Sequence, residues 1–201
     1  MKELRALHAP FCEKCGKKVP QGICKCSDCG KTDHSFTRCR SAFEYGAVRD
    51  ALYRFKYLGR REYAGIFAEM TVRVLEDYIM GIRPDAVAFV PLSREKELKR
   101  GYNQAYDYAL ELSKALGLPL LTDSLRRVKN TAPMKLLSPS ERRKNLKNAF
   151  KSGQNVVKSL RILLVDDIYT TGATMDACSG ILLDAGAEAV YGITLASGEG
   201  V

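Results

Sequence analysis

A run of four aliphatic residues, Ile162 to Val165, ends at two adjacent aspartates. Residues 159–167, which contain this run, form the clearest predicted strand in the chain, because a short apolar segment bounded by polar residues is typical of a strand buried on both faces. Strands of that kind occur mainly in parallel sheets that carry helices on both sides. The run therefore favours an α/β fold.

Segments with strand and helix character alternate along the chain from about residue 41. Residues 47–59 place Val48, Leu52 and Phe55 at helical spacing, whereas residues 85–92 are a β-rich apolar run. The predicted strands span residues 41–46, 85–92, 159–167 and 188–196, and the predicted helices span residues 47–59, 61–79, 101–117 and 173–187. Such alternation predicts a mostly parallel central sheet, with ligand sites at the carboxyl ends of its strands.

The first forty residues are rich in cysteine: six of the seven cysteines lie between residues 12 and 39. Two CxxC pairs, CEKC and CSDC, are separated by ten residues, a spacing at which four thiolates can surround one tetrahedral Zn²⁺. No apolar signal segment is evident, so reduced thiols rather than disulfides are expected. The predicted zinc ligands are Cys12, Cys15, Cys26 and Cys29.

This cysteine pattern leaves alternatives open. A redox or adventitious cluster could use the same thiols, and Cys24, Cys39 or His34 could replace or join one of the four ligands. Because protein side chains would fill all four positions, a water-activating role for the metal is not expected. His8 and His34 are expected to be surface or loop residues, and Cys178 a core residue.

Positive charge is concentrated in two segments. The chain carries a net charge of +9, and residues 1–61 hold 14 Lys or Arg against 6 Asp or Glu. Residues 126–151 hold nine basic residues and one acid. Such concentrations favour contact with phosphates or nucleic acid, although a solvated basic surface explains them equally well. No window approaches the ~20 apolar residues that cross a bilayer, so a cytoplasmic protein is expected.

The residues that follow the aliphatic run combine carboxylates with hydroxyls and a glycine. Asp166 and Asp167 repel one another unless cations or hydroxyl donors engage them, which a ribose diol with Mg²⁺ nearby would do. Residues 170–174 (TTGAT) supply hydroxyls and backbone N–H groups at the predicted start of a helix, which suits a phosphate. Neither a Walker A loop nor a dinucleotide fingerprint is present. A ligand that contains ribose 5-phosphate is therefore favoured over a plain capped loop.

This stretch, ILLVDDIYTTGAT, resembles the phosphoribosyl-pyrophosphate (PRPP) motif of type I phosphoribosyltransferases. The chain as a whole resembles the ComF family, which is related to amidophosphoribosyltransferases and is linked in some bacteria to competence for DNA uptake. The cysteine pairs carry the resemblance together with FEYGAVRDALYRFKYLGRREYA, VPLSREKELKRGYNQA, RRVKNTAPMKLLSPSERRKNLKNAF and VDDIYTTGAT. It implies a type I phosphoribosyltransferase fold over residues 41–201, a zinc ribbon in residues 1–40 and a flexible basic loop at about 126–151.

The same resemblance implies roles for individual residues. The residues expected at PRPP are Asp166 and Asp167 on the ribose hydroxyls, Thr170, Thr171, Gly172, Ala173 and Thr174 on the 5′-phosphate, and Ser93 and Arg94 on the pyrophosphate. Lys99 and Arg100 would add positive charge near the pyrophosphate. The residues expected to act in catalysis are Asp166, Asp167 and Arg94. Arg127 and Thr131 would belong to a flap that closes over the ligand. Three structural alternatives stay open: residues 93–100 could be a solvated helix start, Tyr102 could simply pack, and Asn103 could cap a helix.

Two functions are consistent with these patterns. In the first, the chain transfers phosphoribosyl from PRPP to an unknown nitrogen acceptor and releases pyrophosphate. Thr170 stands where 6-oxopurine transferases carry an acidic residue, which argues against hypoxanthine or guanine; Cys12 is internal, so a complete glutamine amidotransferase is not expected. In the alternative, the chain is a competence accessory protein that binds single-stranded DNA or a helicase partner, with PRPP or a nucleotide as regulatory ligand. Tyr53, Tyr57 and Tyr63 alternate with basic residues as stacking platforms do, which weakly supports the alternative.

Overall fold

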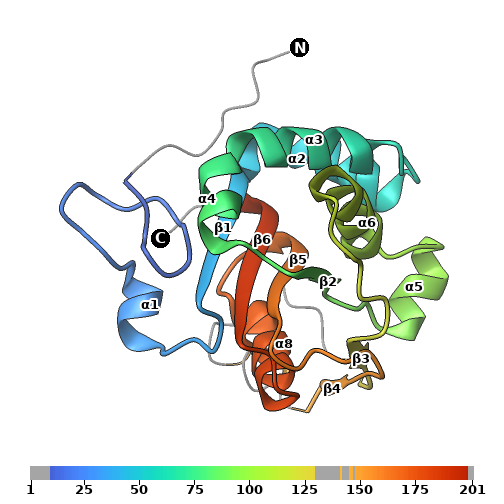
Figure 1. Cartoon of the computed structure of the whole chain (residues 1–201). Coiled ribbons are helices and arrows are strands. Elements are labelled where there is room, and N and C mark those ends of the chain that lie inside the picture. Colours follow the sequence, from blue (N-terminus) through green and yellow to red (C-terminus); the bar gives the residue numbers. More distant parts are fainter. Residues whose placement is uncertain (1–9, 130–140, 142–144, 147, 199–201) are drawn as a thin grey trace.

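The structure, a computed structural model, describes residues 10–129, 141, 145–146 and 148–198 (Figure 1). Within these residues the centre of the fold is a four-stranded parallel sheet with the strand order β1-β6-β5-β2. Its strands are β1 (Arg38–Glu44), β2 (Ala86–Phe89), β5 (Arg161–Tyr169) and β6 (Ala189–Ser197). The predicted α/β fold with a mostly parallel sheet is confirmed.

Helices lie on both sides of the sheet. The helices are α1 (Ser27–Lys31), α2 (Tyr45–Tyr57), α3 (Tyr63–Val74), α4 (Glu76–Ile82), α5 (Arg94–Arg100), α6 (Gln104–Leu116) and α8 (Ala173–Asp184). α2, α3, α4 and α6 contribute to one core, whereas α8 and the cysteine-containing segment contribute to the other (Figure 1). The sheet therefore separates two hydrophobic cores.

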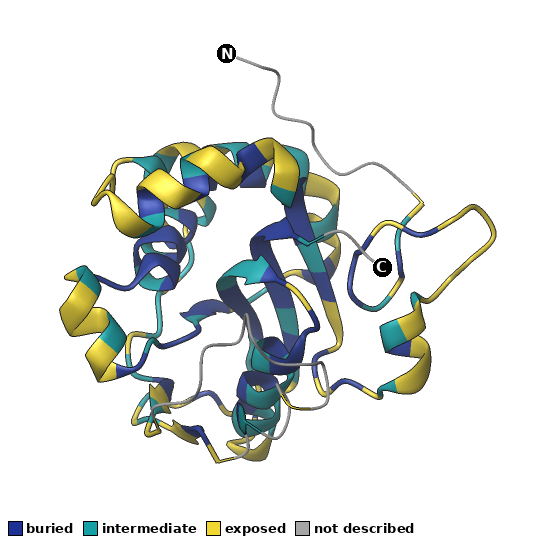
Figure 2. Cartoon of the chain, turned by 180° about the vertical axis from the view of Figure 1, so that it is seen from behind, coloured by how far each residue is buried: buried dark blue, intermediate teal, exposed yellow. Residues whose placement is uncertain are grey.

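The aliphatic run in β5 explains this division. Ile162 and Leu164 belong to the core with α8, and Leu163 and Val165 belong to the core with α2, α3 and α6. All four residues are fully buried, and the strands of the central sheet are coloured as buried over much of their length (Figure 2). Because side chains alternate along a strand, a segment that is apolar at every position can be buried on both faces, and each such side chain stabilises the fold by about 1.5–3 kcal/mol.

Several predicted boundaries differ by a few residues from those of the structure, and two of the differences change the interpretation. The helix predicted over residues 61–79 is two helices, because the backbone at Leu75 departs from helical geometry (φ −110°, ψ 21°). β5 extends beyond its predicted end at residue 167, because its pairing with β6 continues as far as Tyr169 opposite Ser197. Asp166 and Asp167 therefore lie inside the final part of the strand, and not in the loop that follows it.

The segment predicted as a flexible basic loop, residues 126–151, begins and ends in a small antiparallel sheet. β3 (Leu125–Arg127) pairs with β4 (Phe150–Ser152), so the two ends of the segment lie side by side. Residues 130–140, 142–144 and 147, and with them Thr131, lie outside the described residues. The expected flap stays a prediction there.

Residues 10–37 form a small unit that packs against the sheet, and we call it the cysteine module. The backbone N–H of Thr37 donates to the Val190 carbonyl at 2.7 Å, and that of Cys39 donates to the Lys14 carbonyl at 2.8 Å. β1 begins directly after the module, and the division into domains 1–40 and 41–201 stays a prediction. In the described part of the chain, no helix has the length and apolar character needed to span a membrane.

Candidate functional site

The carboxyl ends of β2 and β5 place two loops at one edge of the sheet. These strands are hydrogen-bonded neighbours, and the pairing continues beyond β2 where the Val90 N–H donates to the Val165 carbonyl at 2.9 Å. The chain after β2 leads through Ser93 into α5, and residues 170–172 join β5 to α8. The residues predicted for pyrophosphate and those predicted for ribose 5-phosphate thus follow adjacent strands.

The acidic pair at this edge, Asp166 and Asp167, has a counter-ion within the chain. The backbone N–H of Asp167 donates to Asp166 Oδ1 at 2.8 Å. Lys56 Nζ, which reaches in from α2, lies 2.7 Å from Asp167 Oδ2. Burial and the adjacent Asp167 charge raise the pKa of Asp166 to about 7. One carboxylate is therefore paired with an ammonium, and the other titrates near neutral pH.

Lys56 is a site residue that the sequence analysis did not single out. Its side chain is only 13% exposed, although lysine is rarely buried. It follows Leu52 by four residues, so the two share a face of α2. In the sequence, Lys56 could have been identified as a basic residue on the apolar face of the helix predicted over residues 47–59. A cation that binds at the acidic pair would therefore compete with this ammonium for Asp167.

The loop between β5 and α8 depends on a glycine. Gly172 has φ 74° and caps the N-terminus of α8, and a Cβ at this position would collide with the Tyr169 hydroxyl. Both observations favour glycine over any other residue. Exposure differs along the loop: Thr171, Gly172 and Ala173 are buried, Thr174 is half-buried and Thr170 is exposed. The residues predicted for the 5′-phosphate thus form a tight turn at a helix N-terminus, where backbone N–H groups lack intrahelical partners.

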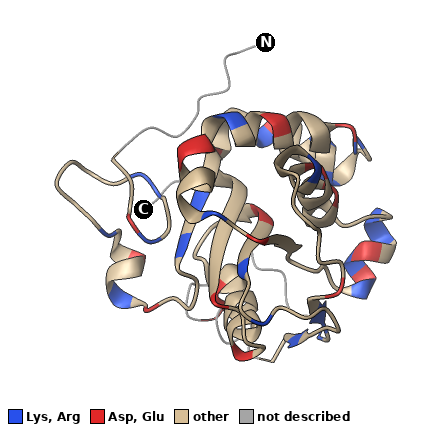
Figure 3. Cartoon of the chain, viewed as in Figure 1, with Lys and Arg blue, Asp and Glu red and all other residues tan. Residues whose placement is uncertain are grey.

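Basic residues occur in α5 and β3, beside the β2–α5 loop (Figure 3). Ser93 is buried at the N-cap of α5, and Arg94 is exposed at the first helical position. Burial and the charges of Arg127 and Arg100 lower the pKa of the Lys96 ammonium. Like charges held together in this way favour an anion, so Lys96 is a second candidate that the sequence analysis did not identify.

Tyr102 and Asn103, which precede α6, have the structural roles that the sequence analysis gave as alternatives to ligand binding. Asn103 caps α6 by accepting the Ala105 N–H at 3.0 Å, and it donates to the Val90 carbonyl at 3.3 Å. The Tyr102 ring is buried with its centroid 6.1 Å from that of Phe55. Neither observation requires a ligand.

The four predicted metal ligands come together. The Sγ atoms of Cys12, Cys15, Cys26 and Cys29 all lie within 4.8 Å of one another, and those of Cys15 and Cys26 are 3.6 Å apart. Tetrahedral zinc with Zn–S bonds of ~2.3 Å requires sulfur–sulfur separations of about 3.8 Å, so the cluster fits a metal such as zinc. The hydrogen bond from the Cys29 thiol lowers the pKa of Cys15 to about 5.

The alternative ligands lie elsewhere. Cys24 is exposed, and Cys39 is buried against Gly192. His34, expected at the surface or in a loop, is buried and stacks on Phe36 with ring centroids 4.7 Å apart. Cys178 is fully buried, as predicted, and His8 lies outside the described residues.

An acidic pair and a tight loop at the edge of a parallel sheet, beside a four-cysteine cluster that fits a metal such as zinc, define the class as an α/β protein with an attached cysteine module. No family model matches the chain. Competence protein F of Haemophilus influenzae is 31% identical over 187 residues, which cover 90% of this chain and 82% of that protein. DNA utilization protein YhgH of Salmonella typhimurium is 30% identical over 187 residues, covering 90% and 81%. The chain belongs to the competence protein F (ComF) family.

The chain is also similar to more distant proteins. Competence protein ComFC of Bacillus subtilis is 28% identical over 207 residues, which cover 96% of this chain and 80% of that protein. Among solved structures, glutamine PRPP amidotransferase from B. subtilis, complexed with ADP and GMP, is 19% identical with a TM-score of 0.43, over 68% of this chain and 26% of that one. Purine phosphoribosyltransferase from Pyrococcus horikoshii is 18% identical with a TM-score of 0.43, over 65% and 73%.

Proposed function

We propose that the carboxyl edge of the sheet binds PRPP with Mg²⁺ and transfers its phosphoribosyl group to a nitrogen acceptor. The observation that carries the proposal is the acidic pair in β5, followed directly by the loop at Gly172. Adjacent carboxylates accept hydrogen bonds from a diol and offer the oxygen ligands that Mg²⁺ takes. The N–H groups at the start of α8 suit the 5′-phosphate of the same ligand.

In this proposal the chain orients the sugar between two charged groups. Asp166 and Asp167 hold the ribose hydroxyls, and residues 170–174 hold the 5′-phosphate. Ser93, Arg94 and the half-buried Lys96 face the pyrophosphate, where positive charge stabilises the negative charge that develops as the C1–O bond breaks. Pyrophosphate leaves with the electron pair, the acceptor nitrogen bonds to C1, and the nitrogen loses its proton. Mg²⁺, when bound, would supply further charge neutralisation.

A pyrophosphate-release assay tests this reaction. Purified protein with PRPP and Mg²⁺ is mixed with a panel of bases and amines, and we expect release above the rate without acceptor for at least one member. Hypoxanthine and guanine are expected to be inactive because position 170 is threonine. If calorimetry detects PRPP binding but no acceptor gives turnover, the proposed binding site stands and the proposed transferase activity is contradicted.

We further propose that the cysteine cluster holds one structural Zn²⁺. Its support is the close approach of the four thiols and the burial of three of them. No fifth side chain among the described residues joins the set, and a closed tetrahedral site leaves no position for substrate. A cytoplasmic location is part of this proposal, because it keeps the thiols reduced. Elemental analysis should give one zinc per chain.

A second function is proposed for the surface of α2 and α5: binding of single-stranded DNA. Tyr53 and Tyr57 are 56% and 50% exposed, and their ring centroids are 5.2 Å apart. The guanidinium of Arg100 lies 5.0 Å from the Tyr57 ring. Exposed rings beside a cation are the pattern on which bases stack. The names of the relatives, competence protein and DNA utilization protein, agree with such a role.

Salt dependence tests the DNA proposal. We expect the affinity for a single-stranded oligonucleotide to fall steeply with salt, and Tyr57→Ala to weaken it by about 1–3 kcal/mol. Tyr63→Ala is a matched control, because Tyr63 packs on Phe67 and not beside Arg100. Equal losses in both variants would contradict the assignment of this surface. A helicase partner is the competing occupant, and it would bind the protein without this salt dependence.

A further inference from the structure

The loop at residues 170–174 is bounded on both sides by residues that contact the cysteine module. Tyr169 immediately precedes the loop, and Asp176 lies in the first turn of the helix that follows it. The contacting residues of the module, Lys17, Ser35 and Phe36, lie more than a hundred positions away in the sequence. Nothing in the linear pattern indicates this arrangement.

On the first side, Tyr169 connects the module to the glycine of the loop. Its ring meets the Phe36 ring edge to face, with centroids 6.3 Å apart, and the Lys17 ammonium lies 5.9 Å from its centroid. The Tyr169 hydroxyl is buried, faces the Cys15 thiol and lies against Gly172. A tyrosine held on one side by Phe36 and Lys17 thus limits the positions that the Gly172 backbone can take.

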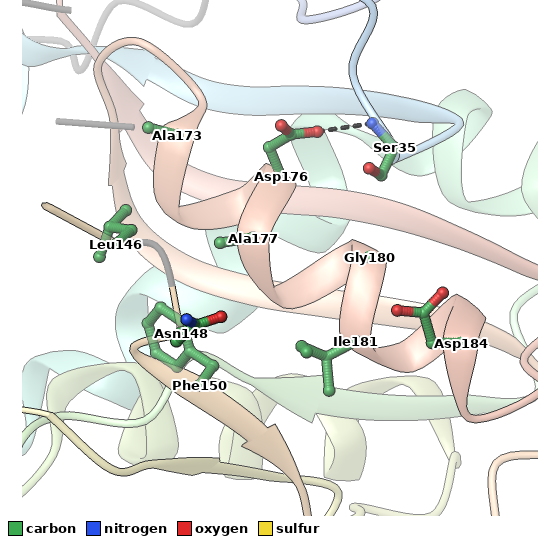
Figure 4. A pocket seen from close by; sticks show the side chains of 10 residues that line it. All are labelled: Ser35, Leu146, Asn148, Phe150, Ala173, Asp176, Ala177, Gly180, Ile181 and Asp184. Atoms are coloured by element: carbon green, nitrogen blue, oxygen red, sulfur yellow. Dashed lines mark hydrogen bonds between the residues drawn. The ribbon is translucent and has the colours of Figure 1, made fainter. Parts of the chain in front are cut away.

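On the second side, Asp176 connects the module to the helix N-terminus. The Ser35 N–H donates to Asp176 Oδ1 at 2.5 Å (Figure 4), and His34 Nδ1 lies 3.7 Å from the same oxygen. Although burial acts in the opposite direction, the nearby His34 ring and the hydrogen bond from the Ser35 N–H lower the pKa of Asp176. The carboxylate therefore ties the first turn of α8 to the segment just after the second cysteine pair.

The module that makes these contacts has little structure of its own. In its described residues the regular elements are the five-residue helix α1 and an isolated bridge between Phe11 and Lys18. Lys17, which faces Tyr169, is paired with Asp28 of α1 at 3.2 Å, and Asp28 lies between two of the clustered cysteines. In so small a unit, metal binding supplies much of the folding free energy. Metal binding should therefore fix the residues of the module that contact Tyr169 and Asp176.

We infer that the cysteine module positions the 170–174 loop through Tyr169 and Asp176, so that metal binding at the four cysteines and phosphate binding at the loop strengthen one another. Tyr169 and Asp176 are positioning residues, and the cysteines act on the ligand only through them. The identity of the ligand rests on the proposed function; the positioning of the loop does not. Because coupling between binding sites is reciprocal, each ligand must raise the affinity for the other by the same factor, typically about 5–150-fold.

The first experiment measures the loop without any ligand. Amide hydrogen exchange over residues 168–176 is compared in zinc-loaded wild type, Phe36→Leu and Phe67→Leu. The two phenylalanines are matched: each is buried, with one stacked and one edge-to-face aromatic partner, namely His34 and Tyr169 for Phe36, and Tyr63 and Phe55 for Phe67. We expect exchange to accelerate about fivefold or more in Phe36→Leu and to stay unchanged in Phe67→Leu.

If Phe36→Leu loses its zinc or fails to fold, Tyr169→Phe decides, because it removes only the hydroxyl that lies against Gly172. Faster exchange in this variant supports the inference. Unchanged exchange in Tyr169→Phe, or equal acceleration in the two phenylalanine variants, overturns it.

The second experiment measures the linkage itself in the wild-type chain. A zinc-selective chelating dye competes for the metal with and without saturating PRPP and Mg²⁺. We expect PRPP to raise the zinc affinity at least fivefold, and Phe36→Leu to bring that ratio toward one. PRPP that binds without changing zinc affinity overturns the inference while the proposed function stands. If PRPP does not bind at all, the proposed function fails, and the exchange experiment alone decides whether the module positions the loop.

Discussion

The acidic edge of the sheet and the cysteine cluster both gather groups that become negatively charged, but they are compensated differently. At the edge, Lys56 supplies a cation from within the chain, 2.7 Å from Asp167. In the cluster, the thiols hydrogen-bond to one another, and four thiolates would need an external cation. The acidic edge therefore needs no ligand to balance the Asp167 charge, whereas the proposed Zn²⁺ would be needed to hold four thiolates together.

The largest expected effect is on the cluster. Cys26→Ser should reduce bound zinc from one per chain to none and unfold the cysteine module, because apparent zinc-binding free energies in small zinc domains reach ~10–16 kcal/mol. Elemental analysis and thermal melting measure both changes. Cys24→Ser is the matched control, since Cys24 is exposed and outside the cluster. Equal zinc loss in both variants would contradict the ligand assignment.

The next effect concerns the edge. Changing Asp166 and Asp167 together to asparagine should weaken PRPP–Mg²⁺ binding at least about a hundredfold, or ~2.7 kcal/mol, because both hydroxyl acceptors lose their charge. Removing the repulsive pair stabilises the fold, whereas the Lys56 ammonium loses its partner, so calorimetry is carried out well below the melting temperature of the variant. Asp184→Asn, at an exposed position of α8, is the control for calorimetry. Retained binding in the double variant would refute the site.

A smaller effect isolates the internal counter-ion. Lys56→Met should destabilise the fold by about 1–3 kcal/mol, because it leaves Asp167 partly buried without its partner. Urea unfolding measures this difference. Arg54→Met, on the exposed face of the same helix, should change stability by less than about 0.5 kcal/mol. If the two variants are equally stable, Lys56 does not compensate the pair.

The smallest effect is a pH dependence. Asp166 has a pKa of about 7 in the fold against an ordinary 3.8, owing to burial and Asp167 and despite Lys56 and Arg127. Protonated Asp166 cannot accept from a diol as a carboxylate does. As the pH is raised toward 7, PRPP affinity should therefore increase by up to about tenfold per pH unit, and above pH 7 it should level off. The folded chain binds this proton more tightly than the unfolded chain does. The contribution of Asp166 to the free energy of unfolding therefore decreases as the pH rises from about 4 to about 7.

Calorimetry at several pH values measures the affinity profile. Asp166→Asn removes the titrating group, so its weaker binding should be nearly independent of pH across the same window. A wild-type profile that is flat between pH 6 and 8 would contradict the raised pKa.

Local patterns predicted much of this molecule. The aliphatic run in β5 and the two CxxC pairs each act through neighbours close in the sequence, so their structural meaning is visible in the chain itself. The break at Leu75 was missed because no glycine or proline marks it. The end of β5 was missed because pairing with β6, which is distant in sequence, carries the strand through two charged residues.

The site was predicted less completely for the same reason. Asp166, Asp167 and the loop at Gly172 stand in one motif, whereas Lys56 and Lys96 acquire their surroundings from other elements. Tyr169 belongs to the motif, but its contact with Phe36 comes from the cysteine module. Tertiary contacts of this kind leave no periodic signal, except that a lysine on an apolar helix face is unusual enough to notice.

β1 also has a consequence for how the molecule avoids sticking to itself. It is a terminal strand of the sheet, pairs with β6 along its length and emerges directly from the cysteine module at Arg38. A chain that lost the module would leave the Val190 carbonyl of β6 and the Cys39 N–H of β1 without their backbone partners, and these groups would become available to other chains. The module therefore also protects a sheet edge against intermolecular pairing.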